Sequence, residues 1–139
     1  MQNLCPSVSV EKLQTTLNSF EKFMNGEDDI TVLIKAALLH YQFATTHLFL
    51  DGNVKIGRLL IALYLYDKGF LKTPCLYISL FFKKYSYLYC EYLMPCVLAA
   101  IEFFLEAIYE TWMKNCRGYY ACHLERRILQ ETRILFTSS

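Results

Sequence analysis

Apolar residues recur at helical spacing along almost the whole chain, and residues that interrupt helices are scarce. Of the 139 residues, five are glycine and three are proline. Steps of three or four residues place apolar side chains on one face of an α-helix, whereas strands alternate every second residue. One such stripe consists of Val10, Leu13, Leu17, Phe20 and Met24. The sequence therefore predicts an all-α fold.

Breaks in this periodicity predict where helices begin and end. We expect a first helix from a cap at Ser9 to Gly26, and a second from a cap at Asp28 or Asp29 to about Thr45. A third helix is expected over residues 55–68, closed by a glycine, and its segment 59–65 is apolar on every side. That pattern is typical of a central helix buried on all faces. Later helices are expected over residues 79–93, 95–117 and 120–134.

The composition excludes several classes of protein. Hydrophobic residues make up 55% of the chain and charged residues 19%, which argues against disorder. The net charge is +1, so no basic excess points to direct binding of nucleic acid. The longest stretch without a charged residue, 36–50, is shorter than the roughly 20 apolar residues of a membrane span. We expect a cytoplasmic protein with reduced cysteines, and we interpret His40 as a packed or surface histidine.

The segment 47–58 combines residue types that suit phosphate chemistry. His47 ends one helix, Asp51 follows four residues later, and Lys55 and Arg58 open the next helix. A helix N-terminus with two cations can bind an anion, and a carboxylate beside phosphates can hold Mg²⁺. A neutral histidine there is a candidate general base. The pattern favours phosphoryl or nucleotidyl transfer, with an ordinary solvated loop as the alternative.

The same segment resembles the signature of the Fic (Fido) family, H-x-F-x-(D/E)-G-N-G-R-x-x-R. Val54 stands where the family has glycine, and Lys55 where it has arginine. The matching positions are His47, Phe49, Asp51, Gly52, Asn53 and Arg58. The resemblance extends over about residues 6–110. It implies a Fic-type helical core, residues 1–115, with the motif loop between two central helices, and a charged C-terminal helix or tail at 116–139.

The family resemblance implies AMPylation, the transfer of AMP from ATP to a Ser, Thr or Tyr hydroxyl of a protein. By that resemblance His47 is the base that deprotonates the hydroxyl, and Asp51 holds Mg²⁺ on the phosphates. The expected ATP-binding residues are Gly52, Asn53, Val54, Lys55, Arg58 and Tyr89. ATP, Mg²⁺ and an unidentified protein substrate or regulator are therefore the expected partners.

Departures from the family pattern favour an impaired activity. If the position of Val54 requires a positive φ, a β-branched residue there costs about 1–3 kcal/mol of strain. Lys55 keeps a charge but loses the bidentate fork of arginine. The family's flap hairpin, which docks the target peptide, would lie upstream of Pro6, so this core is expected to lack it.

Three functions therefore stay open. The first is a protein adenylyltransferase, and the second is a non-catalytic Fic remnant that binds nucleotide or protein. The third is a phosphotransferase of the Doc type, in which ATP binds inverted; the segment 52–55 fits that pattern less well. The sequence leaves open the target, the regulator, whether the chain forms a homo-oligomer, and whether it belongs to a longer protein.

Overall fold

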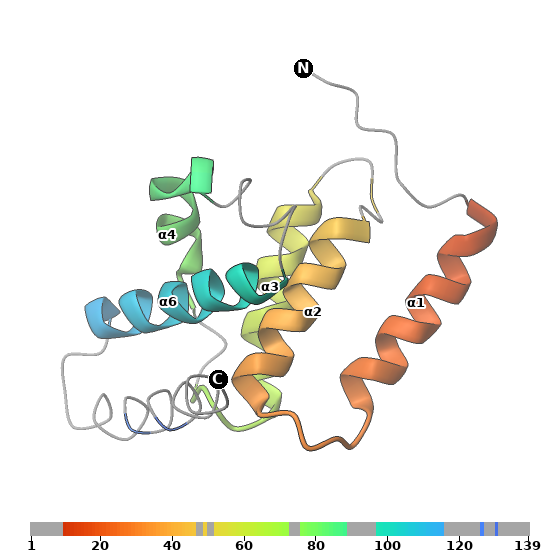
Figure 1. Ribbon diagram of the computed structural model, residues 1–139, viewed down its shortest axis with the longest axis horizontal. Coiled ribbons are helices and arrows are strands. Elements are labelled where there is room, and N and C mark those ends of the chain that lie inside the picture. The colour runs from red at the N-terminus through yellow and green to blue at the C-terminus, as the bar shows by residue number, and fades with distance from the viewer. Residues whose placement is uncertain are drawn as a thin grey trace.

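The chain folds into α-helices, and the residues described contain no strand. The computed structural model describes residues 10–46, 49, 52–72, 76–88, 97–115, 126 and 130. Its helices are α1 (Val10–Asn25), α2 (Val32–Thr46), α3 (Asn53–Asp67), α4 (Ile78–Lys84) and α6 (Val97–Asn115), arranged as in Figure 1. The predicted all-α class is confirmed. The predicted cap at Ser9 and most of the predicted helix at 120–134 lie outside the described residues.

Helix α2 occupies the centre of the fold. It packs against α3 and α6 and more lightly against α1, while α4 packs against α6 (Figure 1). Helix α2 is buried on more than one face, because its apolar residues are not confined to a single stripe. The motif loop follows α2 directly and leads into α3. The loop is therefore attached to the best-packed helix of the described structure.

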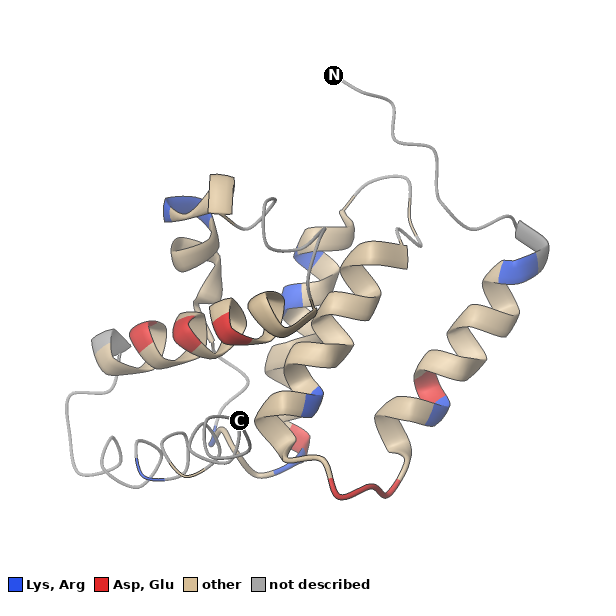
Figure 2. Cartoon of the chain, in the orientation of Figure 1, with Lys and Arg blue, Asp and Glu red and all other residues tan. Residues whose placement is uncertain are grey.

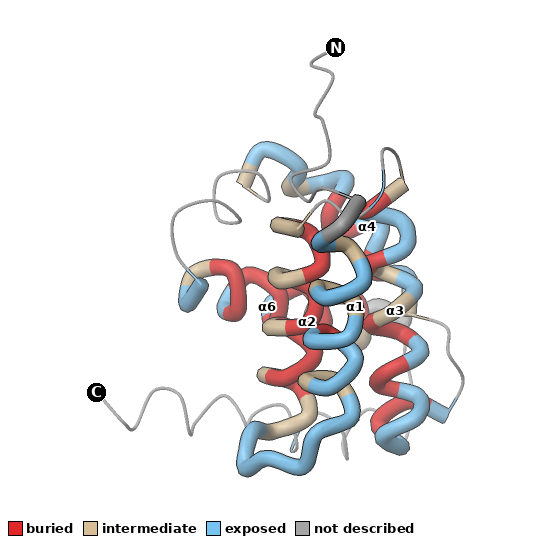
Figure 3. Tube along the Cα trace, turned by 90° about the vertical axis from the view of Figure 1, so that its right-hand side faces the viewer, coloured by how far each residue is buried: buried red, intermediate tan, exposed pale blue. Residues whose placement is uncertain are grey.

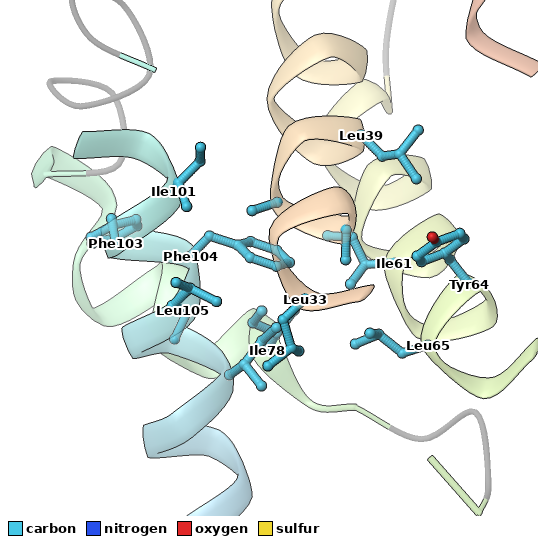
Figure 4. Close-up of a cluster of buried hydrophobic side chains, with 14 of the residues drawn as sticks. Leu33, Leu39, Ile61, Tyr64, Leu65, Ile78, Ile101, Phe103, Phe104 and Leu105 are labelled. Carbon is cyan, nitrogen blue, oxygen red and sulfur yellow. The ribbon is translucent and has the colours of Figure 1, made fainter. Parts of the chain in front are cut away.

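The hydrophobic core joins side chains from all five helices named above. Leu33 of α2, Ile61 of α3 and Ile78 of α4 are almost completely buried. Figure 4 shows them in one cluster with Leu65 and Phe104. Burial of such a side chain contributes about 1.5–3 kcal/mol. This cluster fixes α3 against α2 and so fixes the base of the motif loop.

The connection between α1 and α2 differs from the prediction. Helix α2 begins at Val32, so neither Asp28 nor Asp29 is its cap. The carboxylate of Asp28 accepts the Ile30 N–H at 3.2 Å and the Lys35 ammonium at 2.7 Å. Asp28 therefore stabilises this acidic connection, which Figure 2 shows, through its contact with Lys35, seven residues later in the chain.

The predicted cap of α4 and the predicted burial of α3 also differ from the structure. Helix α4 begins at Ile78 after Tyr77, so Ser79 lies within the helix instead of capping it. Gly69, with φ 68°, follows the end of α3 as expected. Leu59 and Leu63 are 58% and 47% exposed, so the expectation of complete burial for α3 was wrong. Figure 3 shows that α3 is buried along one side only, the side that packs on α2.

Of the described helices, none is both long enough and apolar enough to cross a bilayer.

Candidate active site

The structure describes the second half of the motif, where α3 begins. His47, Asp51 and Tyr89 lie outside the described residues, so their roles stay predictions. The described site residues are Gly52, Asn53, Val54, Lys55 and Arg58. They all lie in the first turns of α3 or immediately before it. The structure thus places the predicted phosphate-binding residues together at one helix N-terminus.

Gly52 sets the direction in which the chain enters α3. Its φ of 81° and ψ of 0° are left-handed values, which cost other residues about 1–2 kcal/mol. A Cβ at this position would meet nothing within 4 Å, so the requirement for glycine is conformational. The Gly52 carbonyl accepts the Ile56 N–H at 2.9 Å. That hydrogen bond closes the first turn of the helix.

Asn53 holds the loop with its side chain. Its Oδ1 accepts the backbone N–H of Phe49 at 2.9 Å, and its Nδ2 donates a hydrogen bond to the Phe49 carbonyl. The residue is only 8% exposed. Both polar ends of the amide are thus used within the loop. The sequence indicated Asn53 as a phosphate contact, but it did not predict this structural contact with Phe49.

Val54 adopts helical backbone within α3. The strain considered for Val54 was conditional on a positive φ at that position; the positive φ occurs at Gly52, and Val54 lies within α3, so that strain is absent. The Val54 side chain is 41% exposed and takes no part in the core cluster. The substitution of valine for the family's glycine is therefore compatible with the structure of this turn.

The start of α3 has the charge distribution of an anion site. The first amides of a helix have no carbonyl partner within it, and the helix dipole adds partial positive charge there. Lys55 is exposed and Arg58 is partly buried. Within the part of the chain that is described, neither cation forms a salt bridge. Such a combination of helix N-terminal amides and cations is chemically suited to bind an anion.

Behind this turn, α3 approaches α2 closely at Gly57. A Cβ on Gly57 would lie 3.3 Å from His40 Nδ1 and 3.3 Å from Phe43 Cδ1. Even an alanine Cβ would therefore require these two side chains to give way by a few tenths of an ångström. A glycine inside a helical pattern costs about 1 kcal/mol relative to alanine, and it often marks a close approach. The glycine at position 57, within an otherwise helical pattern, is the sequence signal of this close approach.

His40 fills the space next to Gly57. It is 3% exposed and stacks on Phe82 and Phe104, with ring centroids 5.4 and 5.5 Å away. Burial, and next the positive charge of Arg58, lower its pKa from 6.5 to about 4, although a hydrogen bond with the Gly57 backbone acts in the opposite direction. The interpretation of His40 as a packed histidine is confirmed. At neutral pH its ring is uncharged.

Within the described ranges, no three His, Cys, Asp or Glu side chains gather in a way that could hold a metal ion. Asp51, the predicted Mg²⁺ ligand, lies outside those ranges.

Comparison with known proteins assigns the segment that contains this site. The profile of the Fic/DOC family matches residues 6–65, which include α2, the motif loop and most of α3. Residues 6–65 belong to the Fic/DOC family. The predicted family resemblance is thereby confirmed for this segment, and its extension to residue 110 stays a prediction.

A curated relative of the Fic segment is protein adenylyltransferase fic-1 of Caenorhabditis elegans. The two sequences are 34% identical over 65 residues. The aligned part is 45% of this chain and 13% of that protein, so the chain spans a small part of this relative's length. No solved structure matches the chain significantly.

Proposed function

We propose that this chain is a Fic-type protein adenylyltransferase that transfers AMP from ATP to a Ser, Thr or Tyr hydroxyl of a target protein. The observation that carries the proposal is the start of α3, where a left-handed Gly52 precedes a helix N-terminus with two cations. This turn lies within the Fic/DOC segment. A relative over that segment is named a protein adenylyltransferase, which supports nucleotidyl transfer as the reaction class.

In this proposal the nucleotide binds through its phosphates. The backbone amides of residues 52–55 surround the α- and β-phosphates, and Arg58 binds the β/γ end. Lys55 contributes a single charge because an ammonium lacks the arginine fork. Asp51 binds Mg²⁺, which neutralises phosphate charge when it is present. Tyr89 lies against the nucleoside.

The proposed reaction forms one bond and breaks another at the α-phosphorus. His47 accepts the proton of the target hydroxyl, and the hydroxyl oxygen attacks the α-phosphorus. The bond between the α-phosphorus and the oxygen that bridges to the β-phosphate breaks, and pyrophosphate leaves. Asn53 keeps the loop in place through its side-chain hydrogen bonds with Phe49.

Labelled ATP tests the proposal. The chain is incubated with Mg²⁺ and ATP labelled on the α-phosphate, using cell extract as the source of targets. We expect protein labelling that His47→Ala abolishes and that His123→Ala, a histidine outside the motif, leaves unchanged. Labelling from γ-labelled ATP alone would instead indicate the Doc-type phosphotransfer.

One observation favours a second candidate function. The exposed Lys55 replaces the bidentate arginine of the family signature, which weakens binding of the charge that develops in the transition state. The alternative is a protein that binds nucleotide without transferring AMP. Binding of ATP measured by calorimetry, together with no transfer under any of the conditions above, would favour this alternative.

A further inference from the structure

The outer side of α3 carries four apolar side chains that remain largely in water. They are Ile56, Leu59, Leu63 and Tyr66, with exposed fractions of 39%, 58%, 47% and 48%. We call these four residues the outer row. Helix α2 packs on the opposite side of α3, and Figure 3 shows the outer side exposed along the helix. Scattered apolar residues are normal on protein surfaces, whereas a contiguous apolar patch marks an interaction site.

The apolar surface continues from the outer row toward α1. Leu63 also lines the groove of about 350 Å³ between α3 and the end of α1, and Met24 and Leu60 contribute to the same lining. The outer row and this groove therefore form one continuous apolar surface. A partner that lies along α3 contacts the row over its full length and the groove at its edge.

The spacing of the outer row is that of a seam between two helices. From Ile56 to Tyr66 the residues follow one another in steps of three, four and three. These steps are the a and d positions of the heptad repeat, through which side chains of one α-helix pack into gaps on another. The spacing indicates that the partner is itself a helix, aligned nearly along α3.

The outer row is complementary to a reversed copy of itself. When a second α3 lies antiparallel to the first, Leu59 of each copy faces Leu63 of the other. In the same register Ile56 faces Tyr66, so a large aromatic ring meets a smaller side chain at both ends. A two-fold axis produces all four contacts at once, as in most protein homodimers.

Charges at the ends of the row favour the antiparallel arrangement. Lys55 lies at the start of the row and Asp67 at its end, and the Asp67 side chain is 75% exposed. The neighbouring Lys68 lies over the Tyr64 ring, 5.7 Å from its centroid. Antiparallel pairing brings Lys55 of each copy to the same end as Asp67 of the other, and it also opposes the two helix dipoles. A membrane-binding helix would instead carry many cations beside its apolar side.

We propose that the outer row of α3 is the interface of a two-fold symmetric, antiparallel dimer of this chain. The inference goes beyond the AMP transfer proposed above and does not depend on it. Each copy contributes little more than one side of one helix, and interfaces below about 1,200 Å² are typical of weak association. Dimers should therefore form at roughly 200 μM protein and dissociate at roughly 5 μM, where the row faces water.

Sedimentation velocity over that concentration range measures the association. We expect the wild type to shift from monomer to dimer, and Leu59→Lys and Leu63→Lys to raise the dissociation constant at least about tenfold. Each replacement introduces two charges into the apolar seam, because both copies carry it. The matched control is Leu80→Lys, since Leu80 of α4 is 73% exposed and lies outside the row, and it should dimerise like the wild type.

Two results of that experiment would overturn the proposal. One is a wild type that stays monomeric at every concentration; if it then floated with vesicles of anionic phospholipid, the row would be a membrane-binding surface. The other is an equal loss of association in Leu80→Lys, which would show that the effect is not specific to α3.

Mixing two variants tests the antiparallel register. In a dimer of Leu59→Lys with Leu63→Glu, one layer pairs the introduced lysine with the introduced glutamate, and the other layer keeps both leucines. We expect the mixture to associate more tightly than either variant alone, which also shows that both variants fold. A parallel pair sets each introduced charge against a native leucine, so no gain on mixing would overturn the proposed arrangement.

Discussion

Asn53 connects the motif loop to α3 by two hydrogen bonds from one side chain, and Gly52 supplies the backbone conformation that makes them possible. The sequence indicated a turn at this Gly-Asn pair, because both residue types tolerate sharp turns. It did not indicate which residue has the positive φ. That depends on where the first helical hydrogen bond forms, and Ile56 makes it to Gly52.

The Asn53 contact is testable by replacement. Asn53→Ala should lower the free energy of unfolding by about 1–3 kcal/mol, because two part-buried hydrogen bonds with the Phe49 backbone are lost, each worth about 0.5–1.5 kcal/mol. Asn53→Asp keeps an acceptor but sets a carboxylate against the Phe49 carbonyl, so it should not restore stability. Urea denaturation measures both variants against Asn25→Ala, an exposed asparagine at the end of α1. Equal midpoints for all of them would contradict the structural role.

The two departures from the family signature should have different effects. Val54 is already helical, so Val54→Gly relieves no strain and should lower stability by up to about 1 kcal/mol. Lys55→Arg restores two parallel hydrogen bonds to phosphate, and a gain near 1.4 kcal/mol corresponds to roughly tenfold. Labelling from α-labelled ATP compares the single variants, each with and without His47→Ala. A gain from Val54→Gly alone would show that this turn changes conformation when nucleotide binds.

At the level of elements, periodicity predicted the existence and order of the helices better than their ends. The ends of α2 and α3 near Thr46 and Gly69 agree with the prediction within a few residues. The start of α2 does not, because Asp28 is bound by Lys35 across the connection and is not available as a cap. Such a contact depends on how α1 and α2 pack, which local sequence rules do not describe.

Lys35 should therefore stabilise the packing of α1 on α2. Its ammonium is buried and binds both the Asp28 carboxylate and the Gly26 carbonyl, at 2.7 and 2.6 Å. Lys35→Met leaves both acceptors without this donor and should lower the free energy of unfolding by about 1–3 kcal/mol. The matched control is Lys68→Met, since the pair of Lys68 with Asp67 is exposed and 3.7 Å long. Thermal or urea unfolding measures the loss in free energy of unfolding for both variants. Equal losses would refute the prediction.

The same contact predicts a pH dependence. The hydrogen bond from Lys35 lowers the pKa of Asp28 below its ordinary value of 3.8. A carboxyl whose pKa is lower in the folded state stabilises the protein above the unfolded pKa and loses this contribution as the pH falls. The stability advantage of the wild type over Lys35→Met should thus shrink as the pH falls below about 3.8. Urea titrations at pH 6 and pH 3 measure this change.

For the whole molecule, the main difference from the sequence prediction is the outer side of α3. Its apolar residues point in every direction, and helical periodicity alone cannot tell which of them the fold covers. In the described structure α2 covers one side, and the exposed apolar residues of α3 are Val54, Ile56, Leu59, Leu63 and Tyr66. A groove of about 350 Å³, lined in part by Leu63, lies between the end of α1 and α3. The sequence could not predict how far each side chain of α3 is buried, because burial depends on how many elements surround the helix.

This difference gives opposite predictions for neighbouring leucines of one helix. Leu59→Lys and Leu63→Lys should raise solubility and change the free energy of unfolding by less than about 0.5 kcal/mol, since both side chains are already largely in water. Leu65→Ala, at a site with no exposure, should cost about 2–5 kcal/mol because it leaves a cavity in the core. Urea denaturation gives the free energies, and light scattering against concentration gives the solubility. If the two lysine variants unfolded as easily as Leu65→Ala, the outer side of α3 would be a packed surface and the burial pattern described above would be wrong. If they stayed folded and became more soluble, the outer apolar side of α3 would be a water-facing surface, and the inner side, with Ile61 and Leu65 in the core cluster, would hold the motif helix.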